Sequence, residues 1–289
     1  MRPDHPFVPW VLAIGVTATA LLVGRAVAVD SAELWDQRIA QRTAAMPQDV
    51  DVAVIGTCLI QPVVGVSGEL ERDAAAAGRD LTVVRLLRPG REWDWEPVAE
   101  ALLERPPIVV ILEMPVLVRN RRPPTSPPPG MVDSLQQVRS AALAFVSAAP
   151  RLPTMRDVRE AWWRRDVATF ETGTWPLAHL DAADIELART QQFHEPDPRA
   201  VELLRALVAR SRGVIVVDLP HHPDHPFSPA YREAIDRITR TLRNAGVLML
   251  AAPDVGASGF LDRAHLGPVG AQRIRGVLVQ ELSTVLNTP

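Results

Sequence analysis

The stretch Asp51–Leu59, with the sequence DVAVIGTCL, decides the fold of this chain. Its first six residues form a short β-branched run that ends in glycine. Apolar runs without clean alternation are typical of strands that are covered on both faces. Four further runs of this kind follow along the chain: Leu81–Leu86, Ile108–Leu112, Val214–Leu219 and Val247–Leu250. The sequence therefore predicts five short strands in a buried sheet.

Helical patterns lie between these strands and after the last one. They cover Trp95–Glu104, Pro198–Arg212, Pro229–Ala245 and Pro268–Leu286. Alternation of strands and helices favours a parallel sheet with right-handed crossovers. The predicted fold class is α/β, with a three-layer, doubly wound, mostly parallel five-stranded sheet formed by residues 49–289.

The segment 119–197 interrupts this alternation. It opens with the proline-rich run Arg119–Gly130 (RNRRPPTSPPPG), which cannot form regular structure. Three helical patterns follow, over Val132–Ala149, Met155–Phe170 and Ala182–Phe193. We expect a helical insertion between the third and fourth strands, acting as a cap or as a lobe that docks a partner.

The N-terminus predicts a membrane anchor. Phe7–Gly24 carries no charge, and a weaker apolar run extends it to Val29. This length is sufficient to cross a hydrocarbon layer of about 30 Å. The alternative is a cleaved signal peptide, because Ala26-Val-Ala28 fits a small-x-small cleavage site. Residues 1–29 place the rest of the chain outside the cytoplasm in both cases, and residues 30–48 are interpreted as a stalk.

Composition excludes several functions. The 289 residues carry a net charge of −3, which gives no basic footprint for nucleic acid. All 31 basic residues are arginine, so lysine Schiff bases and a P-loop are excluded. Cys58 is the one cysteine and cannot form an intrachain disulfide. It is either a buried small hydrophobe or a working thiol.

A second informative motif follows the last predicted strand, in the sequence FLDRAHLGPVGAQRI. Asp262 lies three residues before His265, and a carboxylate at this spacing can hold one imidazole nitrogen while the other faces a nucleophile. Pro268 stands where the last helix begins, and Gly270 allows that helix to pack closely. The alternative is a surface loop in which Asp262 caps the helix.

This motif resembles the last block of the SGNH/GDSL hydrolases, D-x-x-H-L-x-x-x-G. That family has a flavodoxin-like fold, and its nucleophilic serine directly follows the first strand. Cys58 occupies the corresponding position here, in Gly56-Thr57-Cys58-Leu59. The predicted anchor and the early nucleophile are most similar to the membrane-anchored acyltransferases and esterases of this family, which include proteins that modify teichoic acids and glycans. The resemblance implies a triad of Cys58, Asp262 and His265.

Two further blocks of the family are less similar. The resemblance implies that Gly90, after the second strand, provides an N–H that binds the oxyanion. The family's third block provides an asparagine after the third strand, where this chain has Glu113-Met-Pro115. Loss of one oxyanion donor typically slows catalysis by about 10²–10³. This departure argues against efficient hydrolysis.

A cysteine nucleophile would form a thioester, which passes its acyl group readily to an alcohol. The alternative is that Cys58 is an inert buried residue in a degenerate site. His221 and His222 follow the fourth strand, at the edge where open α/β sheets bind ligands, and are expected to line a substrate site. Together with His225 and Asp218 or Asp224 they could hold zinc, but their spacing matches no zinc pattern, so neither a metal nor a cofactor is expected.

The predicted function is acyl transfer or deacylation on an envelope glycan, a lipid-linked acceptor or a related alcohol, at the extracytoplasmic (periplasmic) side of the cell membrane. The alternative is an inactive SGNH-like scaffold that binds glycan or docks onto a multi-pass membrane acyltransferase through 119–197. Fold resemblance alone does not separate the two. Nucleic acid is not an expected partner.

Overall fold

The computed structural model describes residues 35–88, 95–118, 198–223, 229–262 and 265–287. The predicted anchor Phe7–Val29, the insertion 119–197 and Gly90 lie outside these residues. Among the helices that are described, none is both long enough and apolar enough to span a bilayer. The sheet and its helices belong to one compact unit, Arg38–Arg121 with Thr169–Pro289.

Five parallel strands form the sheet, in the order β2-β1-β3-β4-β5. Their bounds are Val52–Gly56 (β1), Val83–Leu87 (β2), Val109–Glu113 (β3), Gly213–Asp218 (β4) and Leu248–Ala251 (β5). Each lies within two residues of its predicted run. The prediction of a five-stranded parallel α/β sheet is therefore confirmed, and the strand order is that of flavodoxin-like proteins.

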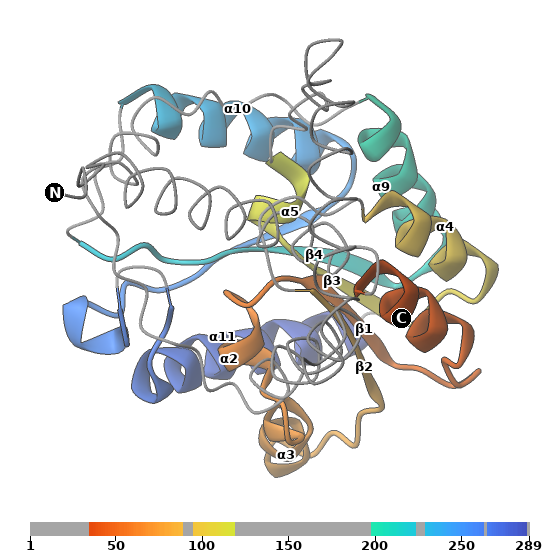
Figure 1. The fold of residues 1–289 in the computed structure, drawn as a ribbon, viewed down its shortest axis with the longest axis horizontal. Helices are drawn as coiled ribbons and strands as arrows, with labels where there is room; N and C mark the ends of the chain where they lie inside the picture. The colour runs from red at the N-terminus through yellow and green to blue at the C-terminus, as the bar shows by residue number, and fades with distance from the viewer. Residues whose placement is uncertain (1–34, 89–94, 119–197, 224–228, 263–264, 288–289) are drawn as a thin grey trace, which may run out of the picture. The chain divides into compact units, whose positions relative to one another are not determined.

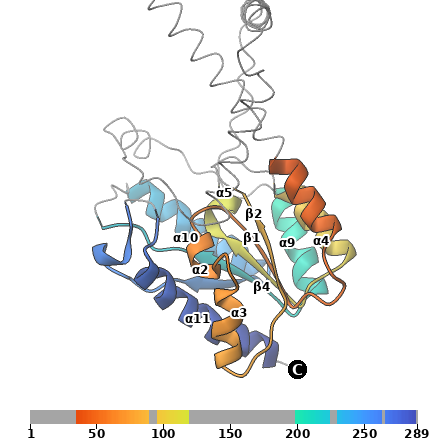
Figure 2. The same ribbon diagram turned by 60° about the horizontal axis from the view of Figure 1, so that its bottom comes forward.

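Helices cover both faces of the sheet (Figures 1 and 2). One face carries α4 (Glu96–Glu104), α5 (Met114–Val118), α9 (Pro198–Arg210) and α10 (Pro229–Asn244). The other carries α2 (Gln61–Val64), α3 (Glu69–Ala76) and α11 (Pro268–Asn287). The three short helices α2, α3 and α5 were not predicted, whereas the other four end within two residues of their predicted bounds.

Successive side chains of a strand point to opposite faces of the sheet, and both faces are buried here. Ala53 and Ile55 of β1 pack into one hydrophobic cluster with side chains of α4, α9 and α10. Val52 and Val54, which point to the opposite face, are equally buried. A strand that is covered on both faces has no polar side, and this is why apolar and polar residues do not alternate along these runs.

Part of the predicted stalk packs against the domain. A helix ends at residue 44, and Ile39 and Met46 are buried in the same hydrophobic cluster as the sheet. Val50, just before β1, joins them. The C-terminal part of 30–48 therefore contributes to the core.

Candidate functional site

The loop between β5 and α11 holds Asp262 and His265 in a defined arrangement. Asp262 Oδ1 accepts a hydrogen bond of 2.7 Å from the backbone N–H of His265, and Asp262 Oδ2 lies 2.9 Å from His265 Nδ1. The side chains of His265 and Asp262 are only 12% and 6% exposed. One carboxylate thus orients both the backbone and the ring of the histidine, which leaves Nε2 as the ring nitrogen available to a nucleophile.

Backbone contacts close this loop onto the start of α11. Leu261 N donates to His265 O at 2.9 Å, and Gly267 N donates to Gly259 O at 2.8 Å. Gly270, in the first turn of α11, lies directly against Gly259, since a Cβ at Gly270 would meet Gly259 O at 2.2 Å. The close packing predicted for Gly270 is therefore present.

Cys58 reaches the same site from the other end of the chain. It lies in the turn between β1 and α2 and is partly buried. Its side chain is close enough to the imidazole of His265 to contribute to the raised pKa of that ring. The structure therefore brings Cys58, His265 and Asp262, the three residues of the predicted triad, together in one place.

Arg275 of α11 ties the two halves of the site together. Its Nε forms an ion pair of 2.6 Å with Asp73 Oδ2 of α3, and its Nη1 donates to the carbonyls of Pro62 and Val63 in α2, each at 3.2 Å. The helix that follows Cys58 is thus held against the helix that follows His265. This clamp is one physical reason why two residues so distant in sequence meet.

The electrostatics of the site favour a charged imidazole. Burial lowers the pKa of His265, but its interactions with Cys58 and Asp262 outweigh this effect and raise the pKa to about 9. His265 is therefore an imidazolium at neutral pH. A cysteine beside an imidazolium is the arrangement that thiolate nucleophiles use.

This raised pKa predicts how stability depends on pH. Below about pH 6.5, His265 is protonated in both the folded and the unfolded chain, so it makes its full contribution to the free energy of unfolding. As pH rises to about 9 only the folded chain keeps it, and the contribution, up to about 3 kcal/mol, is lost. Urea unfolding between pH 6 and 9.5 should show this decline, and His265→Gln should remove most of it. An equal decline in the variant would contradict the assignment.

Glu113 is the site residue whose role was not predicted. Its side chain is fully buried at the end of β3. Glu113 Oε2 accepts the backbone N–H of Thr57 at 2.6 Å, and the Thr57 hydroxyl lies 2.9 Å and 3.0 Å from the two carboxylate oxygens. Both carboxyl oxygens of Glu113 are thus engaged by Thr57.

The histidines after β4 differ in their surroundings. The ring of His222 packs edge-on against Phe260, with centroids 5.3 Å apart, whereas His221 is exposed. His222 therefore lies against the segment that leads into Asp262. Asp224 and His225 lie outside the described residues. In the part of the chain that is described, no three His, Cys, Asp or Glu side chains are grouped to hold a metal ion.

Asp218 adds a titratable group to the same edge of the sheet. It is the last residue of β4, one position beyond Val217, which pairs with Glu113. Burial raises the pKa of Asp218 to about 6. The carboxyl ends of β1, β3 and β4 thus carry Cys58, Glu113 and Asp218 in neighbouring positions.

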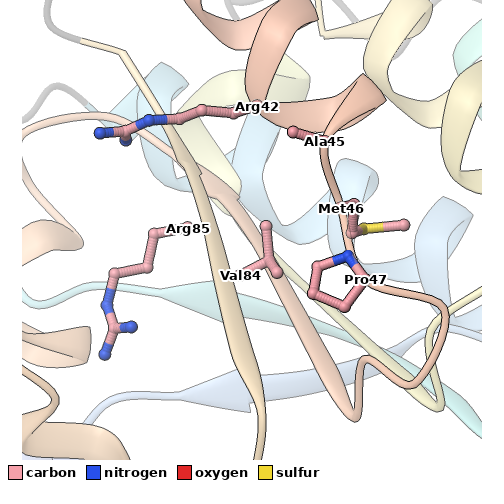
Figure 3. A pocket seen from close by; sticks show the side chains of 6 residues that line it. All are labelled: Arg42, Ala45, Met46, Pro47, Val84 and Arg85. Atoms are coloured by element: carbon pink, nitrogen blue, oxygen red, sulfur yellow. The ribbon is translucent and has the colours of Figure 1, made fainter.

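An open hollow of about 360 Å³ lies elsewhere, between β2 and the segment that precedes β1. Figure 3 shows the side chains of Arg42 and Arg85 extending to the same side, opposite Met46 and Pro47. The Arg85 guanidinium is already bound by Glu71 and by the carbonyls of α2 and its C-terminal end. No residue that lines this hollow belongs to the Cys58 site.

Comparison with known proteins identifies no family for this chain. No protein-family model matches the chain, and a search of curated proteins finds no significant match. Among solved structures, the chain is similar to a variant of an acetyl xylan esterase from Geobacillus stearothermophilus, with a TM-score of 0.38 and 9% identity. The alignment covers 82% of this chain and 97% of that chain. A similarity of this degree assigns no function, which has to be inferred from the residues of the site.

Proposed function

We propose that the chain transfers or removes an acyl group through an acyl-Cys58 thioester. The observation that carries the proposal is the contact series from Cys58 through His265 to Asp262, with the histidine ring held by the carboxylate at 2.9 Å. A structural cysteine in the core has no need of a buried imidazolium on its side chain.

The reaction has two halves. The Cys58 thiolate attacks the carbonyl carbon of an ester, and the tetrahedral intermediate collapses by breaking the C–O bond while the His265 imidazolium gives its proton to the leaving alkoxide. Neutral His265 then takes the proton of an acceptor alcohol or water, whose oxygen attacks the thioester. The C–S bond breaks and the thiolate and the imidazolium are restored. Asp262 holds the ring throughout, and Gly90 is proposed as an oxyanion donor.

We propose transfer as the physiological outcome. Alcohol and water attack the same acyl-Cys58 thioester, which is reactive enough to acylate an alcohol bound beside it in place of water. We propose an envelope glycan or a lipid-linked alcohol as acceptor, because the sequence resembles the anchored branch that modifies such molecules.

The location outside the cytoplasm is part of the proposal and depends on the apolar run Phe7–Val29. The full chain should remain with membranes after carbonate extraction if this run is an uncleaved anchor. A mature N-terminus at Val29 would instead indicate a secreted domain.

The direct test is to trap the thioester. The purified chain is incubated briefly with p-nitrophenyl acetate and denatured in acid, and its intact mass is measured by mass spectrometry. We expect a mass increase of one acetyl group, located on Cys58 by peptide mapping and removed by neutral hydroxylamine, which cleaves thioesters. Cys58→Ser should carry an ester that resists this treatment. Absence of any adduct on Cys58 would favour the alternative, an inactive scaffold that docks a membrane acyltransferase.

A further inference from the structure

We infer that Glu113 is a positioning residue that holds the nucleophile turn so that Cys58 meets His265. This inference rests on the proposed function, because it assigns Glu113 a role in the reactivity of Cys58. It reverses the expectation from the sequence, in which Glu113 marked only the loss of a family asparagine.

Burial is the first step of the argument. The Glu113 side chain has no exposed surface, and a carboxylate is costly to remove from water unless hydrogen bonds satisfy it. The backbone N–H and the hydroxyl of Thr57 provide such bonds at 2.6 Å and 2.9 Å. Thr57 is itself 1% exposed, so the whole contact is shielded from water. Hydrogen bonds that are shielded from water in this way are strong and hold the two side chains in one orientation.

The contact includes both neighbours of Cys58. Thr57 precedes the cysteine and is bound by Glu113 through two atoms. Leu59 follows the cysteine, and its N–H donates to the Thr57 hydroxyl at 3.3 Å. The series from Glu113 through Thr57 to Leu59 therefore restrains the backbone on each side of Cys58. Its side chain is left partly exposed and close enough to His265 to contribute to the raised pKa of that ring.

The geometry of the strands makes this contact possible. Ile55 of β1 pairs with Leu112 of β3, so Gly56 lies opposite Glu113. A Cβ at Gly56 would meet Glu113 Oε2 at 3.0 Å and Ile60 Cγ2 at 2.4 Å. Glycine at this position allows the carboxylate to cross from one strand end to the next and reach Thr57.

Because Cys58 is the only cysteine, its reactivity can be followed without knowledge of the substrate. The experiment measures the rate of alkylation by iodoacetamide against pH in the full-length chain, in mild detergent. The variants are His265→Ala, Glu113→Gln and the double variant. We expect Glu113→Gln to slow alkylation at pH 7 about tenfold. Its curve of rate against pH should have its midpoint at about pH 8.5, as for an ordinary thiol. In the double variant, alkylation should be little slower than in Glu113→Gln alone, because Glu113→Gln has already broken the contact between Cys58 and His265 that His265→Ala removes.

Two controls separate positioning from general loss of stability. Glu100→Gln makes the same chemical change in an exposed ion pair with Arg199 and should leave alkylation unchanged. Leu207→Ala removes a fully buried side chain of α9 and should lower stability without altering the pH profile. If Glu113→Gln keeps the parent rate and profile while His265→Ala slows the parent, the inference about Glu113 is overturned. If His265→Ala has no effect on the parent, the proposed function itself fails.

A second pair of variants decides the case in which Glu113→Gln does not fold. Thr57→Val keeps the shape of the side chain but removes the hydroxyl that joins Glu113 to Leu59. Thr57→Ser keeps the hydroxyl. We expect slowed alkylation in the valine variant and near-parent alkylation in the serine variant. Equal rates in the two would contradict the assignment.

Discussion

Cys58→Ala should abolish acyl transfer, and His265→Ala should reduce it to the same background, at least about a thousandfold below the parent. Nucleophile and base act as a unit, so the loss of either removes the same step. The measurement is the release of p-nitrophenol from p-nitrophenyl acetate under single-turnover conditions, together with the acetyl adduct on the protein.

Cys58→Ser is the matched control for this prediction. It should keep part of the activity but react more slowly than the parent. A serine hydroxyl is hardly ionised at neutral pH, so its attack depends wholly on His265 to take its proton and on oxyanion donors to stabilise the intermediate. If Cys58→Ala retains the activity while deletion of 119–197 removes it, the enzyme hypothesis is wrong and the scaffold alternative stands.

Gly270→Ala should destabilise the chain by about 2–3 kcal/mol and lower activity with it. The added methyl group would meet three backbone atoms of Gly259, at 2.2 Å, 3.0 Å and 3.1 Å. Backbone cannot rotate away as a side chain can, so α11 or the loop must shift. The shift would break the bond from Gly267 N to Gly259 O and loosen the loop that carries Asp262 and His265.

Gly276→Ala is the control in the same helix. A Cβ at Gly276 would meet no atom within 4 Å. Alanine in an open helix position stabilises by about 0.5–1 kcal/mol relative to glycine. Urea unfolding of the two variants should therefore give changes of opposite sign. A stabilising effect of Gly270→Ala would show that the close approach to Gly259 is not required.

The sequence predicted the parts of the fold that depend on local pattern. The run Val52–Gly56 is apolar throughout because the sheet covers it on both sides, and this can be recognised without tertiary information. The helix α2, only four residues with two valines, lies below what periodicity can detect. Glu69–Ala76 consists of good helix formers, and its composition could have been recognised.

The same division applies to the site. The spacing of Asp262 and His265 predicts their contact because three residues of loop bring them within reach. The resemblance to a family added Cys58, whose meeting with His265 depends on the packing of α11 against α2 and α3. The role of Glu113 could not be predicted, since it depends on the register that places the end of β3 opposite Gly56. An acidic residue after an apolar strand otherwise indicates only that the strand has ended.

The clamp made by Arg275 also determines when during synthesis Cys58 and His265 can meet. Its bonds to Asp73 and Val63 join residues 202 and 212 positions apart, and α11 is the last described helix of the chain. Cys58 is therefore made early and remains without its imidazole until the C-terminal helix docks. A chain terminated before α11 would carry Cys58 without the helix that follows His265 and packs against α2 and α3. If acyl transfer is the function of the chain, as proposed, this activity would appear only after α11 has been made and has docked.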